Sequence, residues 1–205
     1  MGADTSSQKT LEARLNDRRS LRSRLIARRL ALSAEECDRL SIAVSEQLRK
    51  NFGQLAAMRV AFCWPVRNEP DLRPLVAEWL AAGQPGFAAL LPVVLREGAA
   101  LAFRPWSLQA LLAPDRYGIP TPVAGDFINP EALLLPVNGF DAAGYRLGYG
   151  GGYFDRTLAV LRSPTRTLLT VGVGFELARV DSICPEAHDV ALDAMVTEAG
   201  VYWTP

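Results

Sequence analysis

The stretch GFDAAGYRLGYGGGYFDR, residues 139–156, gives the clearest indication of the fold and of a site. It follows an apolar run that ends at Val137 and leads directly into a segment with helical character. Five of the nine residues from 144 to 152 are glycine, which leaves backbone N–H groups free to surround an anion without obstruction by Cβ atoms. A strand, a glycine loop and a helix N-terminus in this order predict a phosphate-binding cradle.

Two common phosphate-binding patterns do not describe this stretch. The P-loop needs a lysine after its last glycine, and Lys9 and Lys50 are the only lysines in the chain. The dinucleotide pattern GxGxxG is expected after the first strand of a sheet, whereas this stretch follows a late one. A tight glycine turn at a sheet edge stays open as the alternative. The charges of Arg146 and Asp155 favour the phosphate site, because a guanidinium can neutralise phosphate and a carboxylate can hold a bridging metal ion.

Short apolar runs alternate with helical patterns along the rest of the chain. Buried strands are predicted at residues 60–64, 88–95, 133–137 and 168–175. Helices are predicted at residues 11–30, from the capping box that begins at Ser33, at 72–82 and at 153–161. This order predicts an α/β sandwich in which helices flank a mainly parallel central sheet, after an N-terminal helical pair. Residues 1–205 are expected to form a single domain, with residues 1–10 flexible and 114–130 as a loop.

The charge count is balanced overall but uneven along the chain. Lys and Arg total 22, and Asp and Glu also total 22, which argues against a protein that coats nucleic acid or an anionic membrane. Seven arginines nevertheless fall between residues 14 and 29 against the single acid Asp17. From residue 171 onward there are six acids and only Arg179. The chain therefore permits a local positive pole that suits a small polyanion.

Residue counts exclude several mechanisms. His188 is the only histidine, so a site with several histidine ligands is impossible. The three cysteines are far apart and form no CxxC pair, which indicates neither a disulfide framework nor a zinc module. No apolar run approaches the roughly 20 residues of a membrane span, and no signal-peptide core is present. These features predict a cytoplasmic protein.

The motif resembles that of the 5-formyltetrahydrofolate cyclo-ligases, also called 5,10-methenyltetrahydrofolate synthetases. The family segment has the form FDxxGxRLGxGxGYYD, and residues 140–155 reproduce it with one change, Phe154 for the second tyrosine. The arginine-rich helix resembles the family's first helix, and the resemblance extends from about Arg18 to Glu198.

The resemblance implies ATP-dependent cyclisation of 5-formyltetrahydrofolate to 5,10-methenyltetrahydrofolate, with release of ADP and phosphate. Mg²⁺ is the implied cofactor, and a cytoplasmic monomer that binds neither nucleic acid nor membrane is expected. The catalytic residue would be Arg146. The residues implied for ATP are Arg18, Arg22, Arg146, Leu147, Gly148, Tyr149, Gly150, Gly151, Gly152 and Tyr153. Those implied for folate are Trp64, Glu69, Tyr117 and Tyr153, and those implied for the metal are Asp155 and Asp189.

Other interpretations stay open. Trp64 and Tyr117 can be core aromatics, and the Arg18/Arg22 face can be a solvated helix face. The departures at Arg18, where the family usually has lysine, and at Thr121, where many members have glutamate, favour a binding module that takes up nucleotide or folate without cyclisation. A nucleic-acid-binding protein is disfavoured because no basic stripe continues past residues 49 and 50.

Overall fold

The computed structural model describes residues 3–162 and 167–204, with side chains from residue 17 onward. In order, the elements are α1 (Ala3–Leu30), α2 (Ala34–Asn51), η1 (Gly53–Ala57), β1 (Arg59–Ala61), α3 (Arg73–Ala82), β2 (Ala88–Val93), β3 (Ala102–Pro105), β4 (Leu112–Pro114), β5 (Pro120–Pro122), β6 (Ala132–Pro136), β7 (Gly139–Phe140), β8 (Arg146–Leu147), α4 (Tyr153–Leu161), β9 (Leu169–Val173), η2 (Glu176–Ala178), β10 (Ala194–Thr197) and β11 (Gly200–Trp203).

A seven-stranded sheet in the order β11-β10-β9-β6-β1-β2-β3 forms the centre of the molecule. The five inner strands are parallel to one another, and β3 and β11 pair antiparallel at the two edges. The predicted mainly parallel sheet is therefore confirmed. After β1 the chain continues to β2 on one side and later to β6 on the other, so the direction of strand order changes between β1 and β6.

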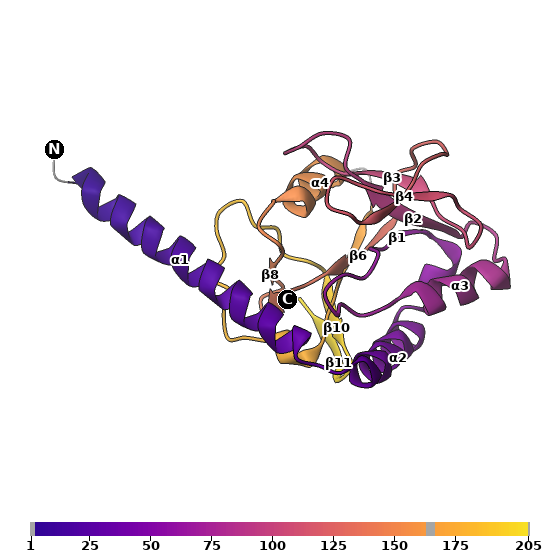
Figure 1. Cartoon of the computed structure of the whole chain (residues 1–205), viewed down its shortest axis with the longest axis horizontal. Coiled ribbons are helices and arrows are strands. Elements are labelled where there is room, and N and C mark those ends of the chain that lie inside the picture. The colour runs from indigo at the N-terminus through magenta and orange to yellow at the C-terminus, as the bar shows by residue number, and fades with distance from the viewer. Residues whose placement is uncertain (1–2, 163–166, 205) are drawn as a thin grey trace.

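Helices cover both faces of this sheet (Figure 1). One core lies under α2 and α3, where Val44 and Leu75 are fully buried against sheet residues such as Val171. The other lies under α4, where Leu158 is fully buried beside Leu133. Both faces of the parallel strands are thus covered, as apolar runs of this kind require. The predicted sandwich is confirmed.

The predicted helix boundaries agree closely with the structure at three of four helices. Ser33 caps α2 by accepting a hydrogen bond from the Glu36 N–H at 3.1 Å. The helix expected at 11–30 begins earlier, at Ala3, and Figure 1 shows its N-terminal part extending away from the body. Residues 1 and 2 lie outside the described residues. Organisation as one domain and the flexibility of residues 1–10 stay predictions.

The expectation of a loop over 114–130 was wrong in part. Pro120–Pro122 form β5, which pairs antiparallel with β4. The Asp115 carboxylate closes the connecting turn by accepting hydrogen bonds from the N–H groups of Tyr117 and Ile119, at 2.7 and 2.9 Å. This Asx turn gives the segment the geometry of a hairpin. Thr121, on β5, is buried and donates to the Ile119 carbonyl.

Candidate functional site

The glycine-rich stretch forms a short ribbon after β6. Gly139–Phe140 pairs antiparallel with Arg146–Leu147. Asp141 holds the turn between the two strands, since its Oδ1 accepts hydrogen bonds from the Ala143 and Tyr145 N–H groups. The chain then passes through exposed residues 148–151 and enters α4 at Gly152, which is left-handed with φ of 63°. The predicted order of strand, glycine loop and helix is confirmed.

Gly144 has a structural role in this ribbon. Its φ is +80°, and an added Cβ would overlap the Thr204 hydroxyl group. We expect Gly144→Ala to lower the free energy of unfolding by about 1–3 kcal/mol, measured by urea or thermal unfolding. Gly53→Ala is the matched control because nothing lies within 4 Å of its Cβ position, and its change should stay within about 0.5 kcal/mol. Equal stability of both variants would contradict this account.

One face of α1 carries arginines to the ribbon. Leu25 lies in the middle of this face, buried against Leu147 and Ile183. Gly139 permits the close approach, since an added Cβ would lie 2.6 Å from Leu25 Cδ1. The Arg22 Nε–H donates to the Gly148 carbonyl at 2.7 Å, and its guanidinium lies next to Gly150. The Arg18/Arg22 face is therefore packed against the rest of the molecule.

Arg18 is buried in an ion pair with Asp189. Its two terminal nitrogens donate to the two Asp189 oxygens at 2.6 and 3.2 Å, and Nη1 also donates to the Cys184 carbonyl. Burial by itself would raise the pKa of Asp189, but hydrogen bonds from Arg18 and the Glu186 N–H outweigh it and hold that pKa below its usual value. His188, the residue before Asp189, is exposed, and its Nε2 lies 3.5 Å from Glu186 Oε2.

Arg146 and Asp155 form a second ion pair. Arg146 is only 5% exposed, and its Nη2 donates to Asp155 Oδ1 at 3.0 Å while Nη1 donates to the Val190 carbonyl at 3.2 Å. Burial lowers the pKa of Arg146, and the Asp155 carboxylate opposes this effect. Because Asp155 also interacts electrostatically with Arg18, the two pairs form one charged cluster beside the glycine loop.

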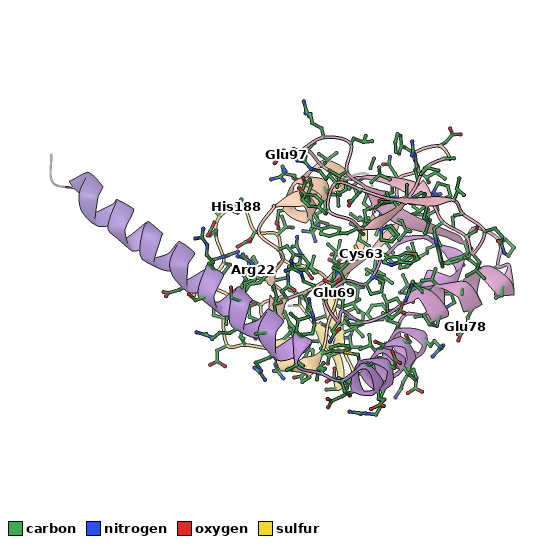
Figure 2. The ribbon with its side chains drawn as sticks, viewed as in Figure 1. Arg22, Cys63, Glu69, Glu78, Glu97 and His188 are labelled. Carbon is green, nitrogen blue, oxygen red and sulfur yellow. The ribbon has the colours of Figure 1, made fainter. Side chains whose placement is uncertain are left out.

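Glu69 lies across from this ribbon, after β1. A turn at Arg67 and Asn68, both left-handed with φ of 51° and 59°, directs the chain back inward. The Glu69 side chain is 3% exposed and accepts from the Val66 N–H at 3.0 Å and from the Tyr149 hydroxyl at 2.7 Å. Burial raises its pKa, although these donors and the nearby Arg29 act in the opposite direction. Figure 2 shows Glu69 and Cys63 inside the body, with Arg22 on α1.

The predicted aromatic residues lie in two places. The Tyr117 and Tyr153 rings meet edge to face at 6.1 Å, and their hydroxyl groups hydrogen bond at 2.7 Å. Trp64 is half-buried after β1, with its ring 6.5 Å from Trp106 and beneath the Arg73 guanidinium at 4.7 Å. Tyr117 is 53% exposed, so it is not a core residue.

Arg29, which was not predicted from the sequence, contacts two of the residues that the family resemblance implies for the site. It is 2% exposed, and its Nη2 donates to the Tyr149 hydroxyl oxygen at 2.9 Å and lies 3.7 Å from Glu69 Oε1. Its spacing from Arg18 and Arg22 could have revealed it, because positions 18, 22, 25 and 29 share one helix face.

The position of the site in the fold is typical of ligand-binding α/β proteins. Glu69 follows β1 and the glycine ribbon follows β6, so both lie at the carboxyl ends of neighbouring parallel strands, where the strand order changes direction. Open α/β sheets bind their ligands at this point. The charged cluster and the glycine loop have the chemistry that an anionic ligand requires.

The chain belongs to the 5-formyltetrahydrofolate cyclo-ligase family, whose sequence profile matches residues 14–198. It is thus an enzyme of the ligase class. The 5-formyltetrahydrofolate cyclo-ligase of Escherichia coli is 28% identical over 178 residues, covering 78% of this chain and 95% of the relative. That of Mycoplasma pneumoniae is 25% identical over 183 residues, covering 89% and 99%.

A solved structure supports the same assignment. The NMR structure of Aquifex aeolicus 5,10-methenyltetrahydrofolate synthetase is similar with a TM-score of 0.77 and 31% identity, covering 91% of this chain and 92% of that chain. Among the described residues no helix is long and apolar enough to cross a membrane.

Proposed function

We propose that this protein converts 5-formyltetrahydrofolate to 5,10-methenyltetrahydrofolate with ATP, and releases ADP and phosphate. The observation that carries the proposal is the grouping of Arg18, Arg22 and Arg146 around a glycine loop that opens a helix, in a chain of this family. Small molecules are its partners, and we propose that it acts as a cytoplasmic monomer that binds no nucleic acid.

The proposed chemistry has two steps. The formyl oxygen attacks the γ-phosphorus of ATP, the bond to the bridging oxygen breaks, and ADP leaves. N10 then attacks the activated formyl carbon and loses its proton, the bond from carbon to the phosphate oxygen breaks, and phosphate leaves. Phosphoryl transfer requires mainly positioning and charge neutralisation from a protein. A site of arginines and backbone N–H groups, without a protein nucleophile, suits these steps.

Each positive side chain has a distinct part. Arg146, held from two sides, would stabilise the charge that develops on the transferring phosphoryl group. Arg18 and Arg22 would neutralise the other phosphates, and the backbone of residues 147–153 would donate hydrogen bonds to them. For this contact Arg18 would exchange part of its pairing with Asp189 for a phosphate oxygen.

The carboxylates fit a magnesium ion unequally. Mg²⁺ bound with a nucleotide uses one or two protein carboxylates together with phosphate oxygens and waters, so a large cluster of acidic ligands is not required. Asp155 is partly exposed, and one of its oxygens is bonded to Arg146. Both oxygens of Asp189 are engaged by Arg18, and Oδ2 also accepts from the Glu186 N–H. When bound, Mg²⁺ neutralises phosphate charge; Asp155 would hold it, with Asp189 as the second carboxylate.

The folate would lie between Glu69 and the aromatic residues. A pterin ring presents neighbouring N–H donors, which a carboxylate accepts as a pair. Trp64, Tyr117 and Tyr153 would provide flat apolar surfaces for the ring systems.

A direct assay separates this proposal from the binding module. Purified protein is mixed with 5-formyltetrahydrofolate and Mg·ATP, the absorbance of the methenyl product is followed, and ADP is quantified. Product and ADP should form in equal amounts. Binding of folate without product would overturn the cyclo-ligase proposal and support the binding module.

The ionisation of Glu69 should set an acid limit for folate binding. The carboxylate form accepts the pterin donors, and burial raises the pKa of Glu69 above its ordinary value of 4.5. As pH falls through this raised pKa, the KM for 5-formyltetrahydrofolate should increase. The increase should begin at a higher pH than it would if Glu69 were exposed.

The variant Glu69→Gln tests this assignment. Its KM for folate should rise about 10- to 100-fold, because a hydrogen bond to a charged group is lost, while the KM for ATP should change less than about threefold. The acid limit of the KM for folate should also disappear from the pH profile of this variant. Equal increases in both KM values would contradict the assignment.

A further inference from the structure

A part-buried chain of hydrogen bonds connects α1, the glycine loop and Glu69. Arg29 Nη2 donates to the Tyr149 hydroxyl oxygen at 2.9 Å, and the Tyr149 hydroxyl donates to Glu69 Oε1 at 2.7 Å. Arg29 is anchored by a second contact, since its Nε–H donates to the Arg67 carbonyl at 2.8 Å. The chain crosses from the ribbon after β6 to the turn after β1.

The direction of these bonds follows from the chemistry of arginine. A guanidinium has donors only, so the Tyr149 oxygen must accept from Arg29 and its own proton must point to Glu69. Arg29 and Glu69 are both nearly inaccessible, and a buried polar group without its partner is costly. Loss of the Tyr149 hydroxyl would therefore leave Glu69 with one fewer donor in its pocket.

Tyr149 belongs to the exposed loop and to this hydrogen-bonded chain at the same time. It lies between Gly148 and Gly150, and Gly150 is left-handed with φ of 93°. The residue is 44% exposed, and the Arg67 guanidinium lies 5.5 Å from the centre of its ring. Its hydroxyl group nevertheless reaches Glu69. The position of Glu69 thus depends on the conformation of the loop that would surround phosphates.

We propose that Tyr149 is a positioning residue that couples the two substrate sites, so that nucleotide on the glycine loop strengthens the binding of folate at Glu69. This inference rests on the proposed function. A nucleotide that orders the loop also fixes Tyr149. Less conformational entropy is then lost at Glu69 when the pterin binds. The coupling is reciprocal, so folate must strengthen nucleotide binding by the same factor.

Several charged or titratable groups face Glu69. Arg29 approaches from α1, Arg67 from the turn of Glu69 itself, Tyr149 from the glycine loop, and Cys63 from the end of β1. Tyr149 is the neutral side chain that donates to Glu69, and with the Val66 N–H it favours the ionised carboxylate. Its removal should move the acid limit of folate binding to higher pH, an effect that a purely structural role would not produce.

The test compares folate affinity with and without Mg·AMP-PNP, an ATP analogue that resists hydrolysis. For the wild type, the Kd of 5-formyltetrahydrofolate should fall about five- to tenfold when the analogue is present, within the usual range of coupling between sites. In Tyr149→Phe this ratio should approach one, and the acid limit should rise. Tyr202→Phe is the matched control, because Tyr202, like Tyr149, donates its hydroxyl proton to a glutamate and has an arginine guanidinium over its ring. Its partners are Glu176, at 2.9 Å, and Arg179. This control should keep the wild-type ratio.

A second variant keeps the test decisive if Tyr149→Phe folds poorly. Arg29→Lys retains the charge, but one ammonium cannot replace the fork that joins the Arg67 carbonyl to Tyr149, so the ratio should also fall. A wild-type ratio of one, or a wild-type ratio retained in the variants, overturns the coupling. A wild-type protein that binds no 5-formyltetrahydrofolate overturns the proposed function as well, and this outcome is distinct from the other two.

Discussion

Lysine in place of Arg146 is expected to lower kcat about 10²- to 10³-fold, the effect of losing one preorganised donor to a developing charge. Arg146 is held by two hydrogen bonds in different directions, to Asp155 and to the Val190 carbonyl. An ammonium is a compact charge and cannot keep both while it contacts a phosphoryl group. Steady-state kinetics with both substrates measures the effect, and the KM for folate should change little.

The control for this variant is Arg49→Lys. Arg49 makes a comparable two-point pair with Glu78, at 3.0 and 2.8 Å, on the exposed surface. This control should keep the wild-type kcat. If Arg146→Lys also keeps the wild-type kcat, Arg146 is not the catalytic group.

Asparagine at Asp155 is expected to lower turnover about 100-fold and to raise the Mg²⁺ concentration needed for half-maximal rate. The amide oxygen can still accept the hydrogen bond from Arg146, so the fold should be preserved, but the negative charge available to Mg²⁺ is lost. The measurement is a titration of the rate with Mg²⁺ at saturating ATP.

A matched carboxylate-to-amide change is Glu78→Gln, at the outer edge of the molecule in Figure 2. It should leave the Mg²⁺ dependence unchanged. An unchanged Mg²⁺ dependence in Asp155→Asn would remove Asp155 from the proposed metal site.

Local patterns were sufficient for much of the fold. The capping box at Ser33 identified the start of α2, and apolar runs identified the central strands β1, β2, β6 and β9. The short hairpin of β4 and β5 could not be read from hydrophobic pattern, because the side chain of Asp115 closes its turn. The edge strands β3 and β11 were likewise not expected, since their positions depend on pairing with neighbours.

The candidate site was predictable where the residues are close in sequence. Residues 139–156 indicated the ribbon, the loop and the helix, and Arg146 and Asp155 in this stretch do lie together. The pairing of Arg18 with Asp189 joins residues 171 positions apart, and no local pattern encodes it. The contact of Tyr149 with Glu69 spans 80 positions and depends on how β1 and β6 meet in the sheet.

Transfer of the formyl oxygen to phosphate would show the proposed phosphorylation of 5-formyltetrahydrofolate directly. The protein is supplied with Mg·ATP and with 5-formyltetrahydrofolate that carries ¹⁸O in its formyl group, and the released phosphate is analysed by mass spectrometry. We expect methenyl product together with phosphate that contains one ¹⁸O atom. Product with unlabelled phosphate, or folate bound without product, would contradict this expectation.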